Sequence, residues 1–459
     1  MAGGAGGGGD GRRLAMAVLA IIDRNKKNFI ELEDAMEGVR NLTIESLEKA
    51  VAGDTVAIRC LTTLDPAGGP GSKVFPPTYS TNDRELKYAV EERILDGQKV
   101  PVVLLDSVAS QANRMEEALL SAWQRDELPF PVVGVDFSKE SELEDLGNIT
   151  TLHAPHRIAD ALFRDSVDEN NVPFRDTDAG SAYTRSNVRN ATAVYRYCPT
   201  ALIFGVWDST GPKGGLGAKF QRAVVSEIVG YHAVAGVKTA SRIDPAGIQA
   251  NVDVFHKQGA HDDWTVDPAQ AEVKSGKPVP FSRKGAEGKG KPSAINHSNV
   301  APSIDRLSGG VTISYAVQSS VISLPALRRL RFPADRPANA SSGQEGQAIE
   351  SAARTALAAL AVAALVYQRA EGYDLRSRSL LLPRDPFRLE FLGGDGQPAE
   401  CFTCSPEQAA TLLKKAAKRA DALGLGWNRE PVKLKPSPKL ADLIRRSREL
   451  AARGGDGDE

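Results

Sequence analysis

The sequence predicts an α+β fold with large insertions, and three observations lead to it. Helix-like and strand-like segments alternate along the 459 residues, but the strands are short and irregularly spaced. No internal repeat of fixed period is present. A hydrophobic fraction of 41% with 25% charged residues is ordinary for a globular protein, and excludes disorder throughout.

The first half of the chain supplies the clearest elements. The residue pattern predicts a helix over 30–52 and a strand over 56–64. Residues 73–79 are expected to be extended, because each proline disfavours a helical conformation at the residue before it. Further strands are expected at 100–105, 130–137 and 200–207, and helices over 107–123, 156–164 and 218–231.

The second half begins with 268–293, which is rich in Pro, Gly, Ser and Lys and predicts a long mobile loop. Ser405 and Gln408 form a plausible capping box that starts a last pair of helices. The other expected elements are strands at 311–321, 375–382 and 387–392 and an alanine-rich helix over 348–369.

Composition limits the class of protein. With 4 cysteines a disulfide scaffold is excluded and a reducing compartment is the expectation. The first 13 residues do not resemble a signal peptide. The longest apolar run, 356–367, is shorter than the roughly 20 residues that span a bilayer. We therefore expect a soluble cytoplasmic protein without a membrane partner.

Charge is distributed unevenly. The whole chain has 57 Lys and Arg against 58 Asp and Glu. Residues 181–340 contain 20 basic and 11 acidic residues, so this segment carries +9 and the remainder −10. Such asymmetry favours a region that faces a polyanion, although a basic solvated surface is the plain alternative. We expect these cations to share one groove.

A glycine-rich loop at 211–219 lies between an expected strand and an expected helix. It matches neither the nucleoside-triphosphate nor the dinucleotide signature. Lys213, Lys219 and Arg222, together with free backbone amides, suit phosphates of any polyanion. The alternative is a flexible turn with solvated lysines.

No sequence motif indicates an enzyme. Cys401 and Cys404 form a single CxxC pair, and a zinc site would need two more distant ligands. No GxSxG or HExxH motif is present, and no spacing of acidic residues nominates a catalytic pair. We expect no metal, no cofactor and no catalytic residue.

Several aromatic residues lie beside cations, an arrangement that holds single-stranded nucleic acid by stacking and phosphate neutralisation. Tyr195 and Tyr197 flank Arg196, and Trp207 precedes the glycine-rich loop. The alternative is that Tyr195 and Trp207 are core residues, and we favour it for Trp207 because that residue ends an apolar run.

Ten short motifs between about residues 74 and 382 together resemble one family. They are FPPTY (75–79), LDS (105–107), QANR (111–114), HRIADA (156–161), RDS (164–166), IFGVWDS (203–209), RIDP (242–245), NHSNV (296–300), LRRLRF (327–332) and GYDLRSR (372–378). The family is the backbone subunit of the type I-G (formerly I-U) CRISPR Cascade, in the repeat-associated mysterious protein superfamily.

The resemblance implies a modified RNA-recognition-motif (ferredoxin-like) core with large insertions over 30–400. A Gly-rich disordered lead-in would occupy 1–29, a C-terminal helical extension 401–459, and the basic loop at 268–296 would be a thumb. The resemblance also implies copies that polymerise head to tail along one CRISPR RNA (crRNA). Other Cascade partners would be the large subunit and the crRNA-processing or capping subunit, with target DNA bound through the crRNA.

Twelve residues are our candidates for RNA binding. They are Lys73, Phe75, Asn113, Arg114, His156, Arg157, Lys213, Lys219, Arg222, Asn296, His297 and Asn299. For each, local capping or an ion pair is the alternative. A rival function is an endoribonuclease of the same superfamily that cuts crRNA-paired target RNA, for which Asp208 and Asp244 are the candidates. A second rival is a DNA-binding or scaffold protein.

Overall fold

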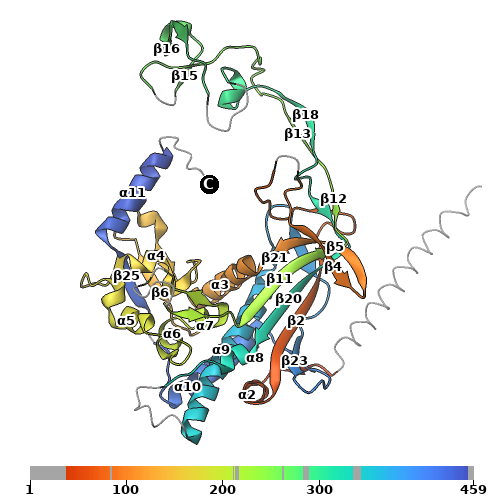
Figure 1. Ribbon diagram of the computed structural model, residues 1–459, viewed down its shortest axis with the longest axis vertical. Helices are drawn as coiled ribbons and strands as arrows, with labels where there is room; N and C mark the ends of the chain where they lie inside the picture. The colour runs from red at the N-terminus through yellow and green to blue at the C-terminus, as the bar shows by residue number, and fades with distance from the viewer. Residues whose placement is uncertain are drawn as a thin grey trace, which may run out of the picture.

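A ten-stranded sheet forms the centre of the body, and it confirms the α+β class (Figure 1). The computed structural model describes residues 38–82, 85–209, 211, 217–260, 263–282, 289–333, 343–428 and 430–452. The four central strands are antiparallel neighbours, in the order β2 (Thr55–Pro66), β20 (Tyr315–Ser323), β11 (Val224–Tyr231) and β5 (Gln98–Asp106). Beyond β5 lies the outer strand β4 (Val90–Leu95). Beyond β2 lie β23 (Leu389–Gly393), β24 (Glu400–Thr403) and β1 (Arg40–Asn41), in that order. The end of β2 also pairs with β22 (Leu380–Pro383), which pairs in turn with β21 (Tyr373–Asp374).

Helices cover one face of this sheet. The longest, α9 (Gln344–Glu371), packs against α2 (Ile44–Ala52), α3 (Val108–Gln124) and α10 (Pro406–Ala422). Its many buried alanines let the neighbouring helices approach closely. By length and composition α9 would be able to cross a membrane, but 83% of its apolar window is buried, as in a core helix. The capping box predicted at Ser405 is confirmed at the start of α10.

A second, smaller sheet packs beside the helices. Its order is β7 (Asn148–Thr150), β6 (Val133–Asp136), β25 (Val432–Pro436) and β8 (Ser166–Val167). The C-terminal segment is therefore integral to the fold, because β25 lies between β6 and β8. The helices around it are α4 (Ala161–Arg164), α5 (Asp178–Thr184), α6 (Thr192–Tyr197), α7 (Thr200–Phe204) and α11 (Pro438–Ala452), and α8 (Leu324–Arg328) follows β20.

Four sequence predictions are wrong in the body. The helix expected over 30–52 begins only at Ile44, because Arg40 and Asn41 form β1; residues 30–37 lie outside the described residues. The apolar run at 200–207 is not one strand but α7 followed by β9 (Val206–Trp207), because a short apolar run does not distinguish a buried helix from a buried strand. The stretch 218–231 is not a helix; it forms β10 (Lys219–Phe220) and β11, which is rich in β-branched residues. The helix expected at 156–164 is broken into a 3₁₀ turn, η2 (Arg157–Ala159), and α4.

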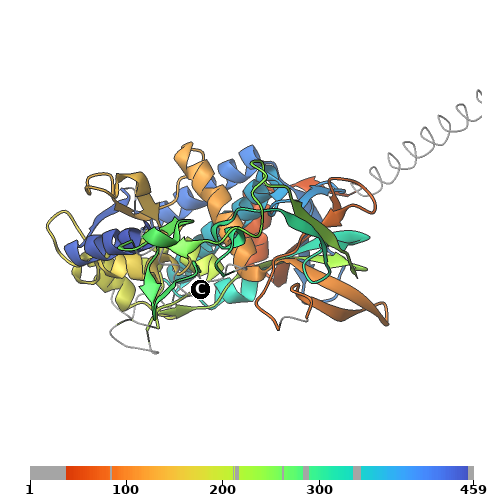
Figure 2. The same cartoon turned by 90° about the horizontal axis from the view of Figure 1, so that it is seen from above.

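A two-stranded ribbon projects from the end of the main sheet and carries a small lobe (Figure 1). The ribbon pairs β13 (Lys238–Arg242) with β18 (Val300–Asp305) in antiparallel register. At its base β12 (Val234–Ala235), β19 (Val311–Thr312) and β3 (Lys73–Val74) form a small sheet. Seen from above, the lobe lies over the body (Figure 2).

We call residues 243–299 the lobe. Its described part contains hairpins and 3₁₀ turns, so the long mobile loop predicted at 268–293 is wrong there. Two hairpins build the lobe, β14 (Phe255–His256) with β15 (Trp264–Thr265) and β16 (Val273–Lys274) with β17 (Lys277–Pro278). The 3₁₀ turn η5 (Pro268–Gln270) joins the two hairpins, and a second 3₁₀ turn, η6 (Pro292–Ile295), follows them. Val254, Phe281 and Ala294 form its apolar cluster. Residues 283–288 lie outside the described residues.

The buried carboxylate of Asp244 joins the two ends of the lobe, next to the ribbon. It accepts hydrogen bonds from the backbone amides of Ser298 (3.0 Å) and Ala246 (3.0 Å), and lies 3.4 Å from the His297 ring. These amide donors lower the pKa of Asp244 to about 2 from an ordinary 3.8. Asn299 completes the contact, since its side chain accepts from the Asp244 amide at 2.7 Å.

We predict that Asp244→Ala loosens the lobe without unfolding the body. The amides of Ala246 and Ser298 lose their acceptor, so their hydrogen exchange should accelerate by at least about tenfold, while exchange in β2 and β20 stays slow. Because the folded pKa is depressed, the carboxylate's contribution is complete above pH 3.8 and is lost as the pH falls towards 2.

The control is Asp253→Ala, which removes an exposed carboxylate of the same lobe that pairs with Lys291 at 2.8 Å. Hydrogen exchange followed by mass spectrometry should leave that variant like the wild type. Equal exchange in both variants would refute the assignment of Asp244.

Candidate nucleic-acid interface

An open cavity of about 550 Å³ lies where the ribbon joins the body, and we call it the basic groove. It is built by segments far apart in sequence. The chain after β3, the chain before β4, the start of β13, the chain after β18 and the turn before β22 all contribute to it. Its lining residues are Phe75, Pro76, Pro77, Thr78, Lys87, Tyr88, Lys238, Ser308 and Arg376.

Phe75 presents an aromatic ring that a cation covers. The Arg378 guanidinium lies 3.9 Å from the ring centroid, and Arg378 has a left-handed backbone (φ 64°) in the turn that places it there. Ser379 fixes the two segments, because its hydroxyl accepts from the Phe75 amide at 2.9 Å and donates to the Phe75 carbonyl at 2.6 Å. Pro76 and Pro77 keep the chain beyond the ring extended.

The cations of the groove come from four segments. Lys87 is exposed, and Lys238 is held by the Ser308 hydroxyl at 2.8 Å and by Asp305 at 3.2 Å. Lys73 donates to the Val237 carbonyl, which fixes its ammonium group at the ribbon base. Cations beside an aromatic ring are the side chains that bind phosphates and stack bases.

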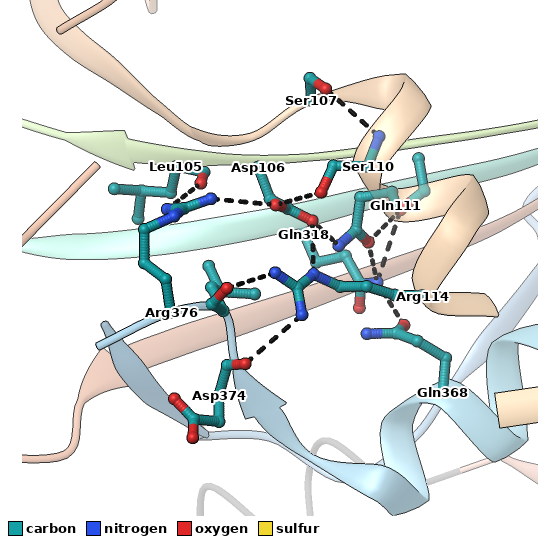
Figure 3. A network of polar contacts seen from close by, with 12 residues as sticks. Leu105, Asp106, Ser107, Ser110, Gln111, Arg114, Gln318, Gln368, Asp374 and Arg376 are labelled. Carbon is teal, nitrogen blue, oxygen red and sulfur yellow. Dashed lines mark hydrogen bonds and ion pairs between the residues drawn. The ribbon is translucent and has the colours of Figure 1, made fainter. Parts of the chain in front are cut away.

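Beneath the groove, the fully buried carboxylate of Asp106 holds two arginines (Figure 3). Arg114 Nε lies 3.0 Å and Arg376 Nη2 3.3 Å from its oxygens. Ser110 Oγ and Gln111 Nε2 also donate to it, each at 2.7 Å. Burial lowers the pKa of Arg376, and the negative charge of Asp106 acts in the opposite direction by raising it.

These arginines also bind main-chain carbonyls, so they join three parts of the chain. Arg114, on α3, donates to the carbonyls of Asp374 (3.4 Å) and Leu375. Arg376 donates to the Leu105 carbonyl of β5 at 2.8 Å. The wall of the groove at Arg376 is therefore positioned by the network under it.

We predict that Asp106→Ala lowers the free energy of unfolding by about 3 kcal/mol, because it leaves two partly buried guanidinium groups without their carboxylate. The measurement is the urea unfolding curve of the full chain. Glu92→Ala is the control: it removes an exposed ion pair with Lys99 (3.3 Å) and should cost less than about 1 kcal/mol. Equal losses would contradict the role of Asp106.

Of the twelve candidate residues, Phe75 lines the basic groove, and Lys73 lies at the base of the ribbon, bonded to the Val237 carbonyl. Arg114 lies beneath the groove, in the Asp106 network, while Asn113 is exposed on α3. The sequence motifs FPPTY and GYDLRSR meet here through the Phe75 and Arg378 contact.

Arg157 and Arg222 lie inside the body. Arg157 makes a two-pronged ion pair with buried Glu116 at 2.6 and 2.7 Å, and donates to the Gly205 carbonyl at 2.9 Å. Arg222 is half-buried and donates to the Val108 carbonyl at 3.2 Å. His156 is exposed beside them.

Lys219 lies on the surface with its ammonium group 4.8 Å from the centre of the Trp207 ring. The core placement favoured for Trp207 is wrong, since the residue is 52% exposed. Because β9 pairs with β10, Trp207 stands opposite Lys219 at an edge rather than within a sheet core. Lys213 lies outside the described residues.

Asn296, His297 and Asn299 lie at the root of the lobe. Asn296 has a left-handed backbone (φ 58°) that ends η6, and all three are exposed. His297 and Asn299 contact Asp244, so they help to fix the lobe on the ribbon.

The cations of 181–340 do not share one groove, contrary to our expectation. Lys238 lines the basic groove, whereas Lys274 and Lys277 lie on the lobe. Arg328 instead caps α2 by donating to the carbonyls of Ala50 (2.8 Å) and Val51 (2.9 Å).

Sequence reasoning missed eight of the nine lining residues, among them Lys87, Tyr88, Lys238 and Arg376, and it also missed Arg378, which covers the Phe75 ring. A signal existed for the last two, because GYDLRSR is one of the motifs that carry the resemblance.

The two aspartates considered for catalysis both have partners. Asp208 is buried and accepts from both terminal nitrogens of Arg175, at 2.8 and 3.1 Å. The carboxylate of Asp244 accepts hydrogen bonds from the backbone amides of Ser298 and Ala246. Within the described ranges no three His, Cys, Asp or Glu residues are grouped as a metal site would require.

The fold and groove define an α+β protein with a cationic, aromatic-lined surface beside a projecting ribbon. Residues 58–235 match the family model described as CRISPR-associated protein GSU0053. The matched part runs from β2 to β12 and includes α3 and the Phe75–Tyr88 side of the groove. The match covers less than half of the chain, so it shows a similarity to that family. No curated protein matches the chain.

Proposed function

We propose that this protein is a non-catalytic crRNA-binding subunit of a Cascade complex, of which several copies line one RNA in the cytoplasm. The observation that carries the proposal is the basic groove, where Phe75, Lys87, Lys238 and Arg376 converge within the region that a CRISPR-associated family model partly covers. The RNA-recognition-type core and the type I-G assignment belong to this proposal.

The chemistry of the groove favours single-stranded RNA. Phosphates would contact Lys87 and Lys238, whose ammonium groups are exposed or half-exposed. A base would stack near Phe75, whose ring is already held by Arg378. Such contacts read the backbone and the ring face of any base, so target sequence would be read by pairing of the RNA with DNA.

The ribbon and lobe suit an element that reaches across a bound strand. The ribbon begins at the groove, because Lys238 both lines the groove and starts β13. The lobe stands clear of the main sheet at the other end of the ribbon (Figure 1). We propose that this projection, rather than 268–296 alone, is the thumb.

The test is the triple variant Lys87→Ala, Lys238→Ala and Arg378→Ala. We expect weaker binding of single-stranded RNA, and a salt dependence about 1.4 units of slope shallower, because the two lost phosphate contacts, at Lys87 and Lys238, remove about 0.7 each, while the loss of Arg378 removes the cation that holds the Phe75 ring. Binding is measured by fluorescence anisotropy at salt concentrations between about 50 and 300 mM, a range wide enough to determine the slope of log K against log salt.

A matched control removes three exposed cations from α10, by Lys414→Ala, Lys415→Ala and Lys418→Ala. Both variants change the net charge equally, so a loss confined to the groove variant supports the site. Equal losses would show that only net charge matters, and unchanged affinity in the groove variant would refute the proposal.

The endoribonuclease is the second candidate, and one incubation separates it from the first. The protein is mixed with crRNA, complementary RNA and magnesium, and the target strand is followed on a gel. Our proposal expects an intact target, since Asp208 and Asp244 are engaged with protein donors. Cuts that disappear in Asp208→Asn or Asp244→Asn would establish the nuclease instead. Co-purification of DNA or of no nucleic acid would favour the scaffold.

A further inference from the structure

Trp207 is a large apolar side chain that the body leaves in solvent, and it does not line the basic groove. It is 52% exposed, although Val206 before it and Asp208 after it are buried. Successive side chains of a strand point to opposite faces, so the burial of both neighbours turns the indole outward. Tryptophan is highly buried on average, and an exposed indole is typical of a surface that binds a partner.

Two buried arginine contacts hold the backbone on either side of Trp207. Arg157, which a buried glutamate pairs, donates to the Gly205 carbonyl at 2.9 Å. Arg175 donates to both carboxylate oxygens of Asp208, at 2.8 and 3.1 Å. The indole is therefore presented by a fixed segment, and little backbone entropy would be lost when a ligand stacks on it.

The indole also has a cation beside it. Because β9 pairs with β10 in antiparallel register, Lys219 stands opposite Trp207, and its ammonium group lies 4.8 Å from the ring centre. Lys219 is exposed, whereas the neighbouring carboxylate of Asp208 is buried and paired. The exposed charge that contacts this ring is therefore positive. An aromatic ring beside a cation is the combination that stacks a base and neutralises its phosphate.

A short series of contacts connects this ring with the basic groove. Arg376 lines the groove and contacts Asp106, the last residue of β5, at 3.3 Å. Two residues further on, the Val108 carbonyl accepts from Arg222 at 3.2 Å, and Arg222 follows Lys219 by three residues. Since consecutive Cα atoms are 3.8 Å apart, the Cα atoms of Asp106 and Lys219 are at most about 30 Å apart. A single strand of several nucleotides would reach from the groove to the ring.

We propose that Trp207 and Lys219 form a second contact for the RNA strand that the basic groove holds. One base stacks on the indole, and an adjacent phosphate lies beside the ammonium group. Every base has a π-face, so this contact accepts any base and agrees with a groove that reads no sequence. The inference rests on the proposed function and adds a second fixed point, so a strand that spans both points binds more tightly than one that reaches only the groove.

A second copy of the chain is the other partner that an exposed tryptophan would suit. Lysine is depleted at protein interfaces, because its ammonium group loses hydration there, whereas a phosphate forms a charge-assisted hydrogen bond with it. The contact between Lys219 and Trp207 therefore favours RNA. Self-association is an outcome that the test separates.

The test measures the affinity of the full chain for oligouridines of two lengths, about 4 and about 12 nucleotides. Trp207→Ala should weaken binding of the long strand about tenfold, the order of one stacked base, and leave binding of the short strand in the groove unchanged. Trp207→Phe keeps an aromatic ring and should lose far less affinity. It also removes one of the four indoles, so quenching of tryptophan fluorescence by the long strand should be weaker in this variant.

Leu443→Ala is the control, because it removes another exposed apolar side chain, 65% exposed on α11, and should bind both strands as the wild type does. Equal losses for both strand lengths in Trp207→Ala would overturn the second contact, since the ring would then support the groove itself. Unchanged binding of the long strand would also overturn it. If sedimentation then showed weaker self-association of Trp207→Ala, the ring would belong to an interface between copies. Failure of the wild type to bind either strand would overturn the proposed function.

Discussion

The burial of one carboxylate, that of Asp106, constrains the whole end of the sheet. A charge inside a protein is tolerated only where donors surround it, and Asp106 has four, from Ser110, Gln111, Arg114 and Arg376. Those donors belong to α3 and to the chain before β22, so the strand end, the helix and the groove wall are fixed together. The groove cation at Arg376 is consequently ordered before any ligand arrives, which reduces the entropy lost on binding.

Sequence patterns predicted the local elements well. The strand expected at 56–64 appears within β2, the helix at 107–123 as α3 and the helix at 348–369 as α9. Each is long or strongly patterned, and α10 begins at a capping box that needs only four residues. The run at 200–207 failed because burial on all sides removes the periodicity on which such predictions depend, and the stretch 218–231 failed because its β-branched residues favour the strand that forms there.

The candidate site was harder to predict, because its contacts join distant residues. Phe75 and Ser379 are bonded across 304 positions, and Arg114 and Leu375 across 261. A single sequence contains no signal of such pairs; the resemblance marked FPPTY, QANR and GYDLRSR without showing that they meet. It also did not separate Arg157, which a buried glutamate holds, from a cation available to a phosphate.

Two of the buried aspartates, Asp106 and Asp244, lie in parts of the molecule that differ in stability. Asp106 is held by side chains of the body, over a cluster that includes Leu105, Ile228 and Tyr373. Asp244 is held mainly by backbone amides at the root of a lobe whose apolar cluster has three residues. Opening costs least where few apolar contacts are buried, so the lobe should open more readily than the groove. A rigid groove beside an adaptable projection would suit the single-stranded RNA that we propose as the ligand, because the projection could adjust to the strand.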